Sequence, residues 1–577
     1  MVYTSNHVLE FPKDATITNV LLDYNIGGVS LDKPSIIDGH SGKVVYTYSS
    51  LRCAVRRMAR YLQVELNVRK GSVVSLLAFN TVHYPVYVHA ILAVGGVVSA
   101  LNPLHIPQVD PLAYINIYSC TKYTQELAHA LSIAQPSQIL VAEELLGNVR
   151  AALKLSKALP SPHISILSLH STSATENIIH IPETLQSGSI EFIPPIYADG
   201  EIEKELAFIC FSSGTSGLPK GVKLSHGNVV SNVYMHSIYL SDMFHPGSVF
   251  AMVVPFFHIL GLEGFTCLYV LNGAPIVVFP KFELQPLLNS IKRDKVTHLN
   301  VVPPIALQFL NNPLADKGDY NSLQCLMNAA APLEQNLTDL LCKKLGVVLT
   351  QWYGLTEASP SVITQRPDQV HIRNTVGKLL PGISLKVLDT NLNECPHGVA
   401  GELCIKGPNV MQGYVGNEEL TDDTIILDGY LRTGDIGYVD DNGYVFLIDR
   451  LKELIKVKGN QVAPAELEAV LRSHPQIDDA AVRGHHIPEE GTDVPVAFIT
   501  TKVPAREYAA LSCEVIKFIK TRVASYKKIY GVQVVDEIPR KREDCEETVA
   551  NEGVEIDNEV IVKAMSHVYN LLTLYIT

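Results

Sequence analysis

One stretch of the sequence, residues 211–222, alternates hydroxyl side chains, glycines and a lysine; we call it the glycine-rich loop. It reads Phe-Ser-Ser-Gly-Thr-Ser-Gly-Leu-Pro-Lys-Gly-Val and follows an apolar run, residues 207–211, that predicts a buried strand. Backbone N–H groups and hydroxyl groups of such a loop can point into one concavity, and Lys220 adds a positive charge. The pattern therefore suits a polyphosphate. Its spacing, Gly214-x-x-Gly217-x-x-Lys220, is not that of a Walker A loop. A flexible surface hairpin is the alternative interpretation.

Two carboxylates and an aromatic ring further along the chain could complete a nucleotide site. Glu357 follows a Tyr-Gly-x-Thr turn and could hold a hard cation such as Mg²⁺, which takes oxygen ligands and usually bridges phosphates. The ring of Tyr353 could stack on a base. The carboxylate of Asp435 could accept two hydrogen bonds from the vicinal hydroxyls of a ribose. The alternatives are a solvated position for Glu357 and a structural ion pair between Asp435 and Arg450.

Four segments, in this order along the chain, resemble the signatures of the adenylate-forming enzymes. This superfamily includes acyl-CoA and aryl-CoA synthetases, firefly luciferases and the adenylation domains of peptide synthetases. The resemblance covers roughly residues 20–540 and is strongest to the 4-coumarate–CoA ligase-like acyl-CoA ligases. It implies a carboxylic acid as substrate, together with ATP, Mg²⁺ and CoA. The four segments are the glycine-rich loop and residues 351–357, 430–435 and 449–466.

The resemblance also implies roles for individual residues. Those expected to bind the nucleotide are Ser212, Ser213, Gly214, Thr215, Ser216, Gly217, Lys220, Ala329, Ala330, Tyr353, Gly354, Thr356, Asp435, Arg450 and Gln461. Those expected to act in catalysis are Lys220, His258, Thr356, Glu357 and Lys456, with Glu357 as the ligand of Mg²⁺. Ala329 stands where the family's adenine wall has glycine, so its methyl group should narrow that wall slightly.

The same resemblance implies an acyl pocket, a channel for CoA and a hinge. The pocket residues are expected to be Phe257, His258, Leu260, Gly261, Val302 and Pro303. Lys458 and Gly459 would border the CoA channel, and Lys452 would be the hinge. Judged without the resemblance, His258 would be a structural histidine on an apolar face. Leu260 replaces a tyrosine common in plant coumarate ligases, which argues against a hydroxycinnamate preference.

The expected reaction has two steps, and other products remain open. The carboxylate attacks the α-phosphate of ATP to give an acyl-adenylate and pyrophosphate, and a thiol then displaces AMP to give a thioester. Alternatives are an adenylation enzyme that loads a carrier protein, a luciferase-like oxygenase, and a pseudoenzyme that only binds nucleotide. The apolar pocket positions favour an aryl or medium-length aliphatic acid. The sequence leaves the exact acid, the pathway and the oligomeric state open.

The resemblance breaks near the C-terminus. The family normally ends in a segment whose last lysine binds the substrate carboxylate and the α-phosphate during adenylation. Here Cys545 stands at the expected position, and residues 541–577 show no family pattern. Lys541 or Lys527 could take the place of this lysine, but only their proximity to the expected position supports that role. We therefore hypothesise that adenylation is weakened while ATP binding survives.

The elements that must position these residues follow from the spacing of apolar side chains. Apolar runs predict strands at 75–79, 138–142, 207–212, 248–254 and 275–279, and amphipathic stretches predict helices at 50–62 and 284–294. This alternation predicts an α/β fold with mostly parallel sheets in a large N-terminal domain. Residues 382–415 predict a small β-rich subdomain.

A small α+β domain is expected at the C-terminal end. It should contain a strand at 444–451, helices at 463–472 and 514–523, and strands at 478–484 and 494–500. We expect four parts in the chain: an N-terminal AMP-binding domain at 1–449, a hinge at 450–452, a mobile C-terminal domain at 453–540 and a divergent tail at 541–577.

Composition excludes several classes of protein. The 577 residues are 47% hydrophobic and 18% charged, which excludes general disorder. The net charge of −13 argues against a nucleic-acid-binding face. Ten cysteines without a Cys-x-x-Cys motif indicate neither a zinc site nor a disulfide framework.

Residues 71–109 carry no Lys, Arg, Asp or Glu, a length that could span a membrane. Prolines, glycines and polar residues interrupt them, so we predict a buried strand at 72–78, a helix at 84–94 and a strand at 97–101. The N-terminus lacks the pattern of a signal peptide, and the C-terminal Tyr-Ile-Thr is not a peroxisomal address. A cytoplasmic protein is therefore expected.

Overall fold

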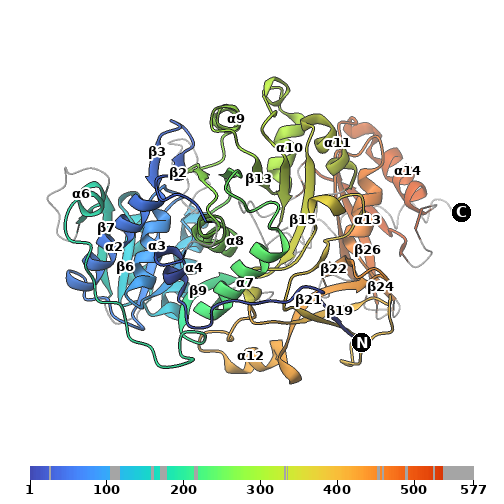
Figure 1. The fold of residues 1–577 in the computed structure, drawn as a ribbon. Coiled ribbons are helices and arrows are strands. Elements are labelled where there is room, and N and C mark those ends of the chain that lie inside the picture. Colours follow the sequence, from blue (N-terminus) through green and yellow to red (C-terminus); the bar gives the residue numbers. More distant parts are fainter. Residues whose placement is uncertain are drawn as a thin grey trace, which may run out of the picture. The chain divides into compact units, whose positions relative to one another are not determined.

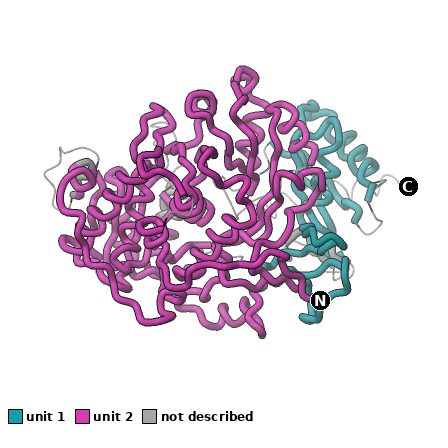
Figure 2. Tube along the Cα trace, viewed as in Figure 1, with its two compact units in different colours: residues 1, 387–403, 433–577 teal, residues 2–386, 404–432 magenta. Residues whose placement is uncertain are grey.

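The structure is a computed structural model of the chain. It describes residues 1–24, 28–103, 117–156, 162–168, 178–212, 219–329, 333, 335–450, 455–457, 460–487, 492–520, 522–523, 527–536 and 538. The chain divides into two compact units (Figure 2). The large unit contains residues 2–386 and 404–432, and the small unit contains residues 1, 387–403 and 433–577. The division expected from the sequence remains a prediction; its parts are residues 1–449, 450–452, 453–540 and 541–577.

A seven-stranded sheet forms one half of the large unit, with the strand order β10-β9-β5-β4-β6-β7-β8 (Figure 1). All neighbouring strands are parallel except β9 and β10, which form an antiparallel hairpin around the glycine-rich loop. The carboxyl end of β9 therefore leads directly into that loop. The strands are β4 (Val73–Leu77), β5 (Val97–Ala100), β6 (Gln138–Ala142), β7 (His163–Ser168), β8 (Ile178–His180), β9 (Leu206–Ser212) and β10 (Lys220–Ser225).

A nine-stranded sheet forms the other half, with the order β17-β16-β15-β14-β13-β11-β12-β2-β3. Neighbouring strands from β2 to β15 in this order are parallel, and the strands at both edges, β3 and β16–β17, pair antiparallel. The strands are β2 (Pro34–Asp38), β3 (Val44–Thr47), β11 (Phe250–Met252), β12 (Ile276–Val278), β13 (His298–Val301), β14 (Cys325–Asn328), β15 (Val348–Gly354), β16 (Ser361–Thr364) and β17 (Lys378–Leu379).

Helix α3 (Tyr84–Ala93) is buried along its whole length, which explains the long uncharged segment of the sequence. It packs against α1, α2 and η2, a π-helix at Gly264–Tyr269 that continues α8 (Figure 1). The predicted strand–helix–strand order of this segment is confirmed by β4, α3 and β5. Within the described residues, no helix combines the length and the apolar character that a membrane crossing requires.

The large unit also contains helices outside these two sheets and two short strands, β1 and β20, that belong to a further six-stranded sheet. The helices are α1 (Ile17–Leu22), α2 (Tyr48–Val64), α4 (Ile117–Ala134), α5 (Leu146–Leu155), α6 (Ile181–Gln186), α7 (His226–Tyr239), α8 (Ile259–Glu263), α9 (Leu284–Arg293), α10 (Pro303–Asn311), α11 (Gln335–Leu345) and α12 (Glu418–Thr424). Short antiparallel strands are β1 (Val2–Thr4) and β20 (Ile425–Ile426). The chain passes between the units within β18 (Ser384–Leu388), β19 (Gly401–Lys406) and β21 (Tyr430–Val439).

The small unit contains a three-stranded sheet packed on two helices. Its core includes Val462, Leu467, Leu471, Ile499 and Val515, all buried. The order is β25-β26-β27, with β25 and β26 antiparallel and β26 and β27 parallel. The elements are β22 (Val445–Arg450), β23 (Ile455–Val457), β24 (Asn460–Val462), α13 (Pro464–Arg472), β25 (Asp479–Ile487), β26 (Thr492–Thr500), α14 (Tyr508–Lys520) and β27 (Gly531–Val534).

The mixed α/β fold class is confirmed, and some predicted boundaries were wrong. The strand predicted at 248–254 covers only β11, because the residues after it turn away to carry Phe257 and His258. The strand predicted at 478–484 continues to Ile487, because β25 pairs with β26 over nine residues. The helix predicted at 514–523 begins at Tyr508 and ends at Lys520. The β-rich segment ends with β19, and residues 407–415 form no regular strand.

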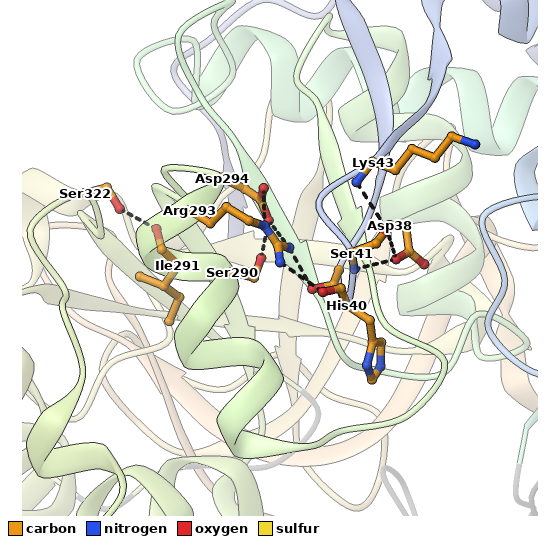
Figure 3. A network of polar contacts seen from close by, with 10 residues as sticks. Asp38, His40, Ser41, Lys43, Ser290, Ile291, Arg293, Asp294 and Ser322 are labelled. Atoms are coloured by element: carbon orange, nitrogen blue, oxygen red, sulfur yellow. Dashed lines mark hydrogen bonds and ion pairs between the residues drawn. The ribbon is translucent and has the colours of Figure 1, made fainter.

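A polar network ties the end of α9 to the turn between β2 and β3 (Figure 3). Arg293 donates to the carbonyls of Gly39 (2.8 Å) and His40 (2.9 Å), and it pairs with Asp294 at 2.7 Å. Ser290 Oγ donates to the same carboxylate at 2.7 Å. Gly42 has a φ of 74°, and a Cβ there would lie 2.4 Å from Arg293 Nε. The turn therefore accommodates the guanidinium only with glycine at this position.

We expect Arg293→Ala to lower the free energy of unfolding by about 2 kcal/mol, because two carbonyls lose a charged donor. Arg293→Lys should recover less than half of the lost free energy of unfolding, since one ammonium group cannot reproduce the planar, forked hydrogen bonding of the guanidinium. Urea denaturation followed by circular dichroism measures the change. Arg506→Ala is the matched control, because that arginine is 82% exposed and, within the described part of the chain, its ion pair is with its sequence neighbour Glu507. Equal stability of the two alanine variants would contradict the prediction.

Candidate active site

Glu357 lies in a short 3-10 turn, Thr356–Ala358, that follows the carboxyl end of β15. The turn is held against the next strand, because the Leu355 N–H donates to the Pro360 carbonyl at 2.9 Å. Asn409 Nδ2 donates to the Ala358 carbonyl at 2.6 Å. A Cβ on Gly354 would lie 2.0 Å from the Pro360 oxygen, so glycine is required for this close approach. The local fold thus fixes the position of the Glu357 backbone.

The carboxylate of Glu357 is 9% exposed and is oriented by two hydroxyl donors. Ser212 Oγ, at the end of β9, donates to Oε1 at 2.9 Å. Tyr414 Oη donates to the same oxygen at 2.9 Å. The predicted metal ligand and the start of the glycine-rich loop are therefore in direct contact, although 145 residues separate them in sequence.

Lys220, the first residue of β10, belongs to the same group of side chains. Its Nζ lies 5.3 Å from the centre of the Tyr414 ring, within range of a cation–π interaction. Backbone hydrogen bonds connect β10 with the Tyr414 segment, from Val415 N to Gly221 O (2.8 Å) and from Lys223 N to Gly413 O (2.9 Å). Tyr414 thus contacts both the predicted phosphate-binding lysine and the predicted metal-binding carboxylate.

Sequence reasoning missed Tyr414. The residue follows glycine in a segment without periodic pattern, and its partners lie 57 and 194 positions away. No local signal marks such a contact. Its ring is 5% exposed, so it is a buried part of the site.

We expect Tyr414→Phe to reduce the rate of acid-dependent pyrophosphate release about tenfold. The reason is that the buried carboxylate loses the hydrogen bond from Tyr414 Oη, and hydrogen bonds to charged groups contribute about 1.5–3 kcal/mol. Tyr414→Leu should in addition weaken ATP binding, because it removes the ring beside Lys220. Initial rates over a range of ATP and Mg²⁺ concentrations measure both effects.

Tyr320→Phe is the matched control for this pair. Its hydroxyl donates to the Ala315 carbonyl at 2.7 Å, between α10 and β14 and apart from the residues described above. We expect a change in stability only. A Tyr414→Phe enzyme whose kcat and Mg²⁺ dependence match those of Tyr320→Phe would contradict the positioning role of Tyr414.

Thr356 carries a buried hydroxyl without a partner among the described residues. The residue is 1% exposed, and its Oγ1 has no hydrogen bond. A buried hydroxyl normally finds a partner. A ligand oxygen such as that of a phosphate would supply one. This fits the nucleotide-binding role predicted for Thr356.

No group of three or more His, Cys, Asp or Glu side chains in the described part of the chain could hold a metal ion. Mg²⁺ is usually held by one or two carboxylates together with phosphate oxygens. A single buried carboxylate, Glu357, that shares Tyr414 with the predicted phosphate-binding Lys220 therefore fits Mg²⁺ bound with ATP. It does not fit a metal site built from protein ligands alone.

Strands β14 and β15 end next to each other and carry the predicted adenine-binding residues. Asn328 Nδ2 donates to Gln351 Oε1 at 2.8 Å, and Ala329 and Tyr353 are buried. Trp352 points to the other face of β15, where its ring stacks on His236 at 5.1 Å. Tyr353 therefore lies on the same face of the strand as Gln351.

The predicted acyl-pocket residues flank α8. His258 caps this helix by accepting from the Leu260 N–H at 3.5 Å, and Leu260 is 8% exposed. A Cβ on Gly261 would lie 2.0 Å from the Pro255 oxygen, so the helix packs on the preceding turn only with glycine there. Phe257 is partly buried; Val302 is buried, and Pro303 opens α10.

Asn80, which sequence reasoning also missed, fixes the turn before His258. Its Nδ2 donates to the carbonyls of Val254 (2.9 Å) and Phe279 (3.3 Å), and its Oδ1 accepts from Phe256 N–H at 2.7 Å. These atoms lie at the carboxyl ends of β11 and β12, whereas Asn80 follows β4. One side chain therefore connects the two sheets beside the predicted pocket.

In the small unit, Asp435 is 8% exposed and faces Arg450 across the β21–β22 ladder. The Asp435 N–H donates to Thr433 Oγ1 at 3.1 Å, and the Gly434 N–H donates to Glu402 Oε1 at 3.1 Å. These bonds hold the turn that carries the predicted ribose ligand. Lys456 and Gln461 are paired partners in the β23–β24 hairpin.

Several predicted residues lie outside the described residues, and their roles stay predictions. These are Ser213, Gly214, Thr215, Ser216, Gly217, Ala330, Lys452, Lys458, Gly459 and Cys545. For Arg450, Lys456 and Gln461 the structure describes only the backbone.

Comparisons with known proteins identify the family of this chain. The AMP-binding enzyme family matches residues 27–415, and its C-terminal domain matches residues 466–544. A probable 4-coumarate–CoA ligase 1 of Dictyostelium discoideum is 36% identical over 514 residues, 87% of this chain and 88% of that protein. This chain belongs to the adenylate-forming family of acid–CoA ligases.

Other relatives support the membership. The 4-coumarate–CoA ligase of Pinus taeda is 34% identical over 88% of this chain and 89% of its own. The ATP-bound crystal structure of MatB from Rhodopseudomonas palustris shares the fold, with a TM-score of 0.76 over 91% of this chain and 96% of that one at 24% identity. The protein is therefore an enzyme of the AMP-forming class of ligases, and the family uses ATP and CoA.

Proposed function

We propose that this enzyme activates a carboxylic acid with ATP as an acyl-adenylate and transfers the acyl group to CoA. The observation that carries the proposal is the buried Glu357 carboxylate, held by Ser212 and Tyr414 beside Lys220. This group combines one anion, one cation and hydroxyl donors at the mouth of a glycine-rich loop. Such a set can bind a metal-bound triphosphate and neutralise its charge.

In the first step, a carboxylate oxygen of the acid attacks the α-phosphorus of ATP, the bond to the β-phosphate oxygen breaks, and pyrophosphate leaves. Lys220 and the loop hydroxyls would stabilise the negative charge that develops on the phosphates. Thr356 Oγ1, which has no hydrogen-bond partner among the described residues, would donate to a phosphate oxygen. Mg²⁺ bound at Glu357 would supply further positive charge there.

In the second step, the CoA sulfur attacks the acyl carbonyl, the bond to the AMP oxygen breaks, and the thiol proton is released. We assign Lys456 and Gln461 to the nucleotide in this state, Lys458 and Gly459 to the CoA channel, and Lys452 to the hinge. We further propose residues 1–449 and 453–540 as the two moving domains, in a cytoplasmic enzyme.

The acid is expected to be aryl or medium-length aliphatic. Leu260 and Val302 are apolar and buried, and His258, the N-cap of α8, lies two positions before Leu260. Because an aliphatic side chain stands at residue 260, a substrate recognised by a tyrosine hydroxyl at that position is not expected.

An ATP–pyrophosphate exchange assay with a panel of acids, followed by mass spectrometry of products formed with CoA, tests the proposal. We expect slow, acid-dependent exchange and an acyl-CoA product. Cys545→Lys should raise the rate of ATP–pyrophosphate exchange about 100-fold. This is the typical effect of one preorganised group on a reaction in which charge develops on the phosphates. ATP binding without acid-dependent exchange in either protein would identify a nucleotide binder. Transfer to a carrier protein but not to CoA would identify a carrier-loading enzyme.

A further inference from the structure

Helix α4 packs against β10, the edge strand of the seven-stranded sheet that begins at Lys220. Leu127 and Leu131 are buried and anchor the helix in a hydrophobic core together with residues of β4, β6 and β7. His129 and Ile133 are partly buried, and their spacing of four residues places them on one face of the helix. The helix is thus held to the core by one face and turns a different face, with His129 and Ile133, to the surroundings of Lys220.

His129 contacts the residue before Lys220. Its Nε2 lies 3.0 Å from the carbonyl oxygen of Pro219. A carbonyl oxygen can only accept, so Nε2 carries the proton and donates it. Because the peptide group is planar, a hydrogen bond that holds the Pro219 oxygen also orients the plane that contains the Lys220 nitrogen. The proline ring adds rigidity, since it fixes φ. This contact therefore restrains the backbone that enters Lys220.

Ile133 contacts the residue after Lys220. Gly221 is buried, and a Cβ built on it would lie 2.7 Å from Ile133 Cγ2 and 3.3 Å from side-chain atoms of Ile209 and Val415. A β-branched side chain has little rotamer freedom in a helix, so Ile133 cannot easily turn away. From another direction, the Val415 N–H donates to Gly221 O at 2.8 Å. The backbone that leaves Lys220 is therefore confined as well.

We propose that His129 and Ile133 are positioning residues that fix the backbone of Lys220 for binding of the ATP polyphosphate. Their two contacts lie at residues 219 and 221, immediately before and after the lysine. The ammonium group itself lies over the Tyr414 ring, 5.3 Å from its centre. A cation that is already in place needs no reorganisation when it meets charged phosphates. This inference rests on the proposed function and assigns to α4 a role in it.

Binding of ATP and of AMP to the full-length protein with Mg²⁺, measured by calorimetric titration, tests the role of His129. AMP lacks the β- and γ-phosphates. His129→Met keeps the side-chain length but removes the donor, so it should raise the Kd for ATP about tenfold, the effect of one lost hydrogen bond. The Kd for AMP should not change. His129→Gln should retain most of the affinity for ATP, because its Nε2 is as many bonds from Cα as the histidine Nε2. A purely structural histidine would change the thermal midpoint but not the ratio of the two constants.

A pair of substitutions tests the contact of Ile133. Gly221→Ala should weaken ATP binding about tenfold, because the added methyl group displaces the backbone next to Lys220. Ile133→Ala in the same chain removes the atom that this methyl group would meet first, so the double variant should bind ATP more tightly than Gly221→Ala. If the two residues acted independently, the losses would add instead.

Ser156→Ala is the matched control for these variants. Ser156 Oγ, at the C-cap of α5, donates to the Ala128 carbonyl at 2.9 Å, one residue before His129 on α4. This substitution removes a hydrogen bond to the same helix without changing a contact to β10. We expect both dissociation constants to remain at their wild-type values. Weakening of ATP binding by Ser156→Ala as large as that caused by His129→Met would overturn the proposal, because any loosening of α4 would then have the same effect.

Acid-dependent pyrophosphate exchange, measured on the same proteins, separates this inference from the proposed reaction. If the wild type activates no acid but His129→Met weakens binding of ATP and not of AMP, the positioning role stands and the proposed reaction fails. If acids are activated but His129→Met binds ATP like the wild type, or the double variant binds it no better than Gly221→Ala, the positioning role is wrong and the reaction stands. If the wild type does not bind ATP, both are overturned.

Discussion

Glu357→Gln should lower the rate of acid-dependent pyrophosphate release about 100- to 1000-fold, the effect of removing one preorganised group that acts on developing charge. Glutamine has nearly the same size, and its amide oxygen can still accept from Ser212 and Tyr414, the two donors to Oε1 at 2.9 Å. The variant therefore loses the negative charge but keeps the packing. ATP binding should change far less, because Lys220 and the glycine-rich loop are intact.

Two measurements separate this effect from misfolding. Trp352 is the one tryptophan of the sequence, is 6% exposed and adjoins Tyr353, so its fluorescence can report ATP binding directly. Asp294→Asn is the matched control: that carboxylate is 7% exposed and pairs with Arg293, but it belongs to the α9 network and not to the site. We expect it to reduce stability without reducing kcat. If Glu357→Gln kept more than a tenth of the wild-type rate, Glu357 would not act in catalysis.

The parts of the site that the sequence predicted are those with local signals. The apolar run before the hydroxyls and glycines predicted a strand at 207–212, which β9 confirms. The antiparallel pairing that sets Lys220 opposite Ser212 is known only from the structure. Prolines and polar residues interrupt any membrane-spanning pattern in the uncharged segment, so the sequence predicted a strand, a helix and a strand there. The elements β4, α3 and β5 confirm this prediction. Strand and helix periodicity depends on neighbouring residues, so it can be read from one sequence.

The parts that were missed depend on contacts between distant residues. Tyr414 reaches Glu357 across 57 positions, and Asn80 reaches Phe256 across 176. Nothing in the residues around either side chain marks these partners. Sequence pattern gives the elements, whereas such residues follow from their tertiary arrangement.

Gly354→Ala should displace site residues, because the added methyl group would clash with the backbone of the neighbouring strand. A Cβ at this position would lie 2.0 Å from the Pro360 oxygen and 2.8 Å from the Cα of Ser361, both backbone atoms that no side-chain rotation can move. The strands β15 and β16 would have to separate, which should cost about 1–3 kcal/mol of stability. The hydrogen bond from Leu355 N to Pro360 O, now 2.9 Å, would lengthen.

The displaced segment carries two predicted site residues, Tyr353 just before Gly354 and Glu357 in the turn that follows it. A shift of about 1 Å at a catalytic group can cost about 100-fold in rate, so we expect a loss of that size even at temperatures where the variant is folded. Thermal unfolding and pyrophosphate release, measured on the same preparation, give the two effects separately. Gly147→Ala should be neutral in both assays, since its Cβ would meet no atom. A Gly354→Ala enzyme with normal kcat and an unchanged thermal midpoint would show that this contact does not hold the turn.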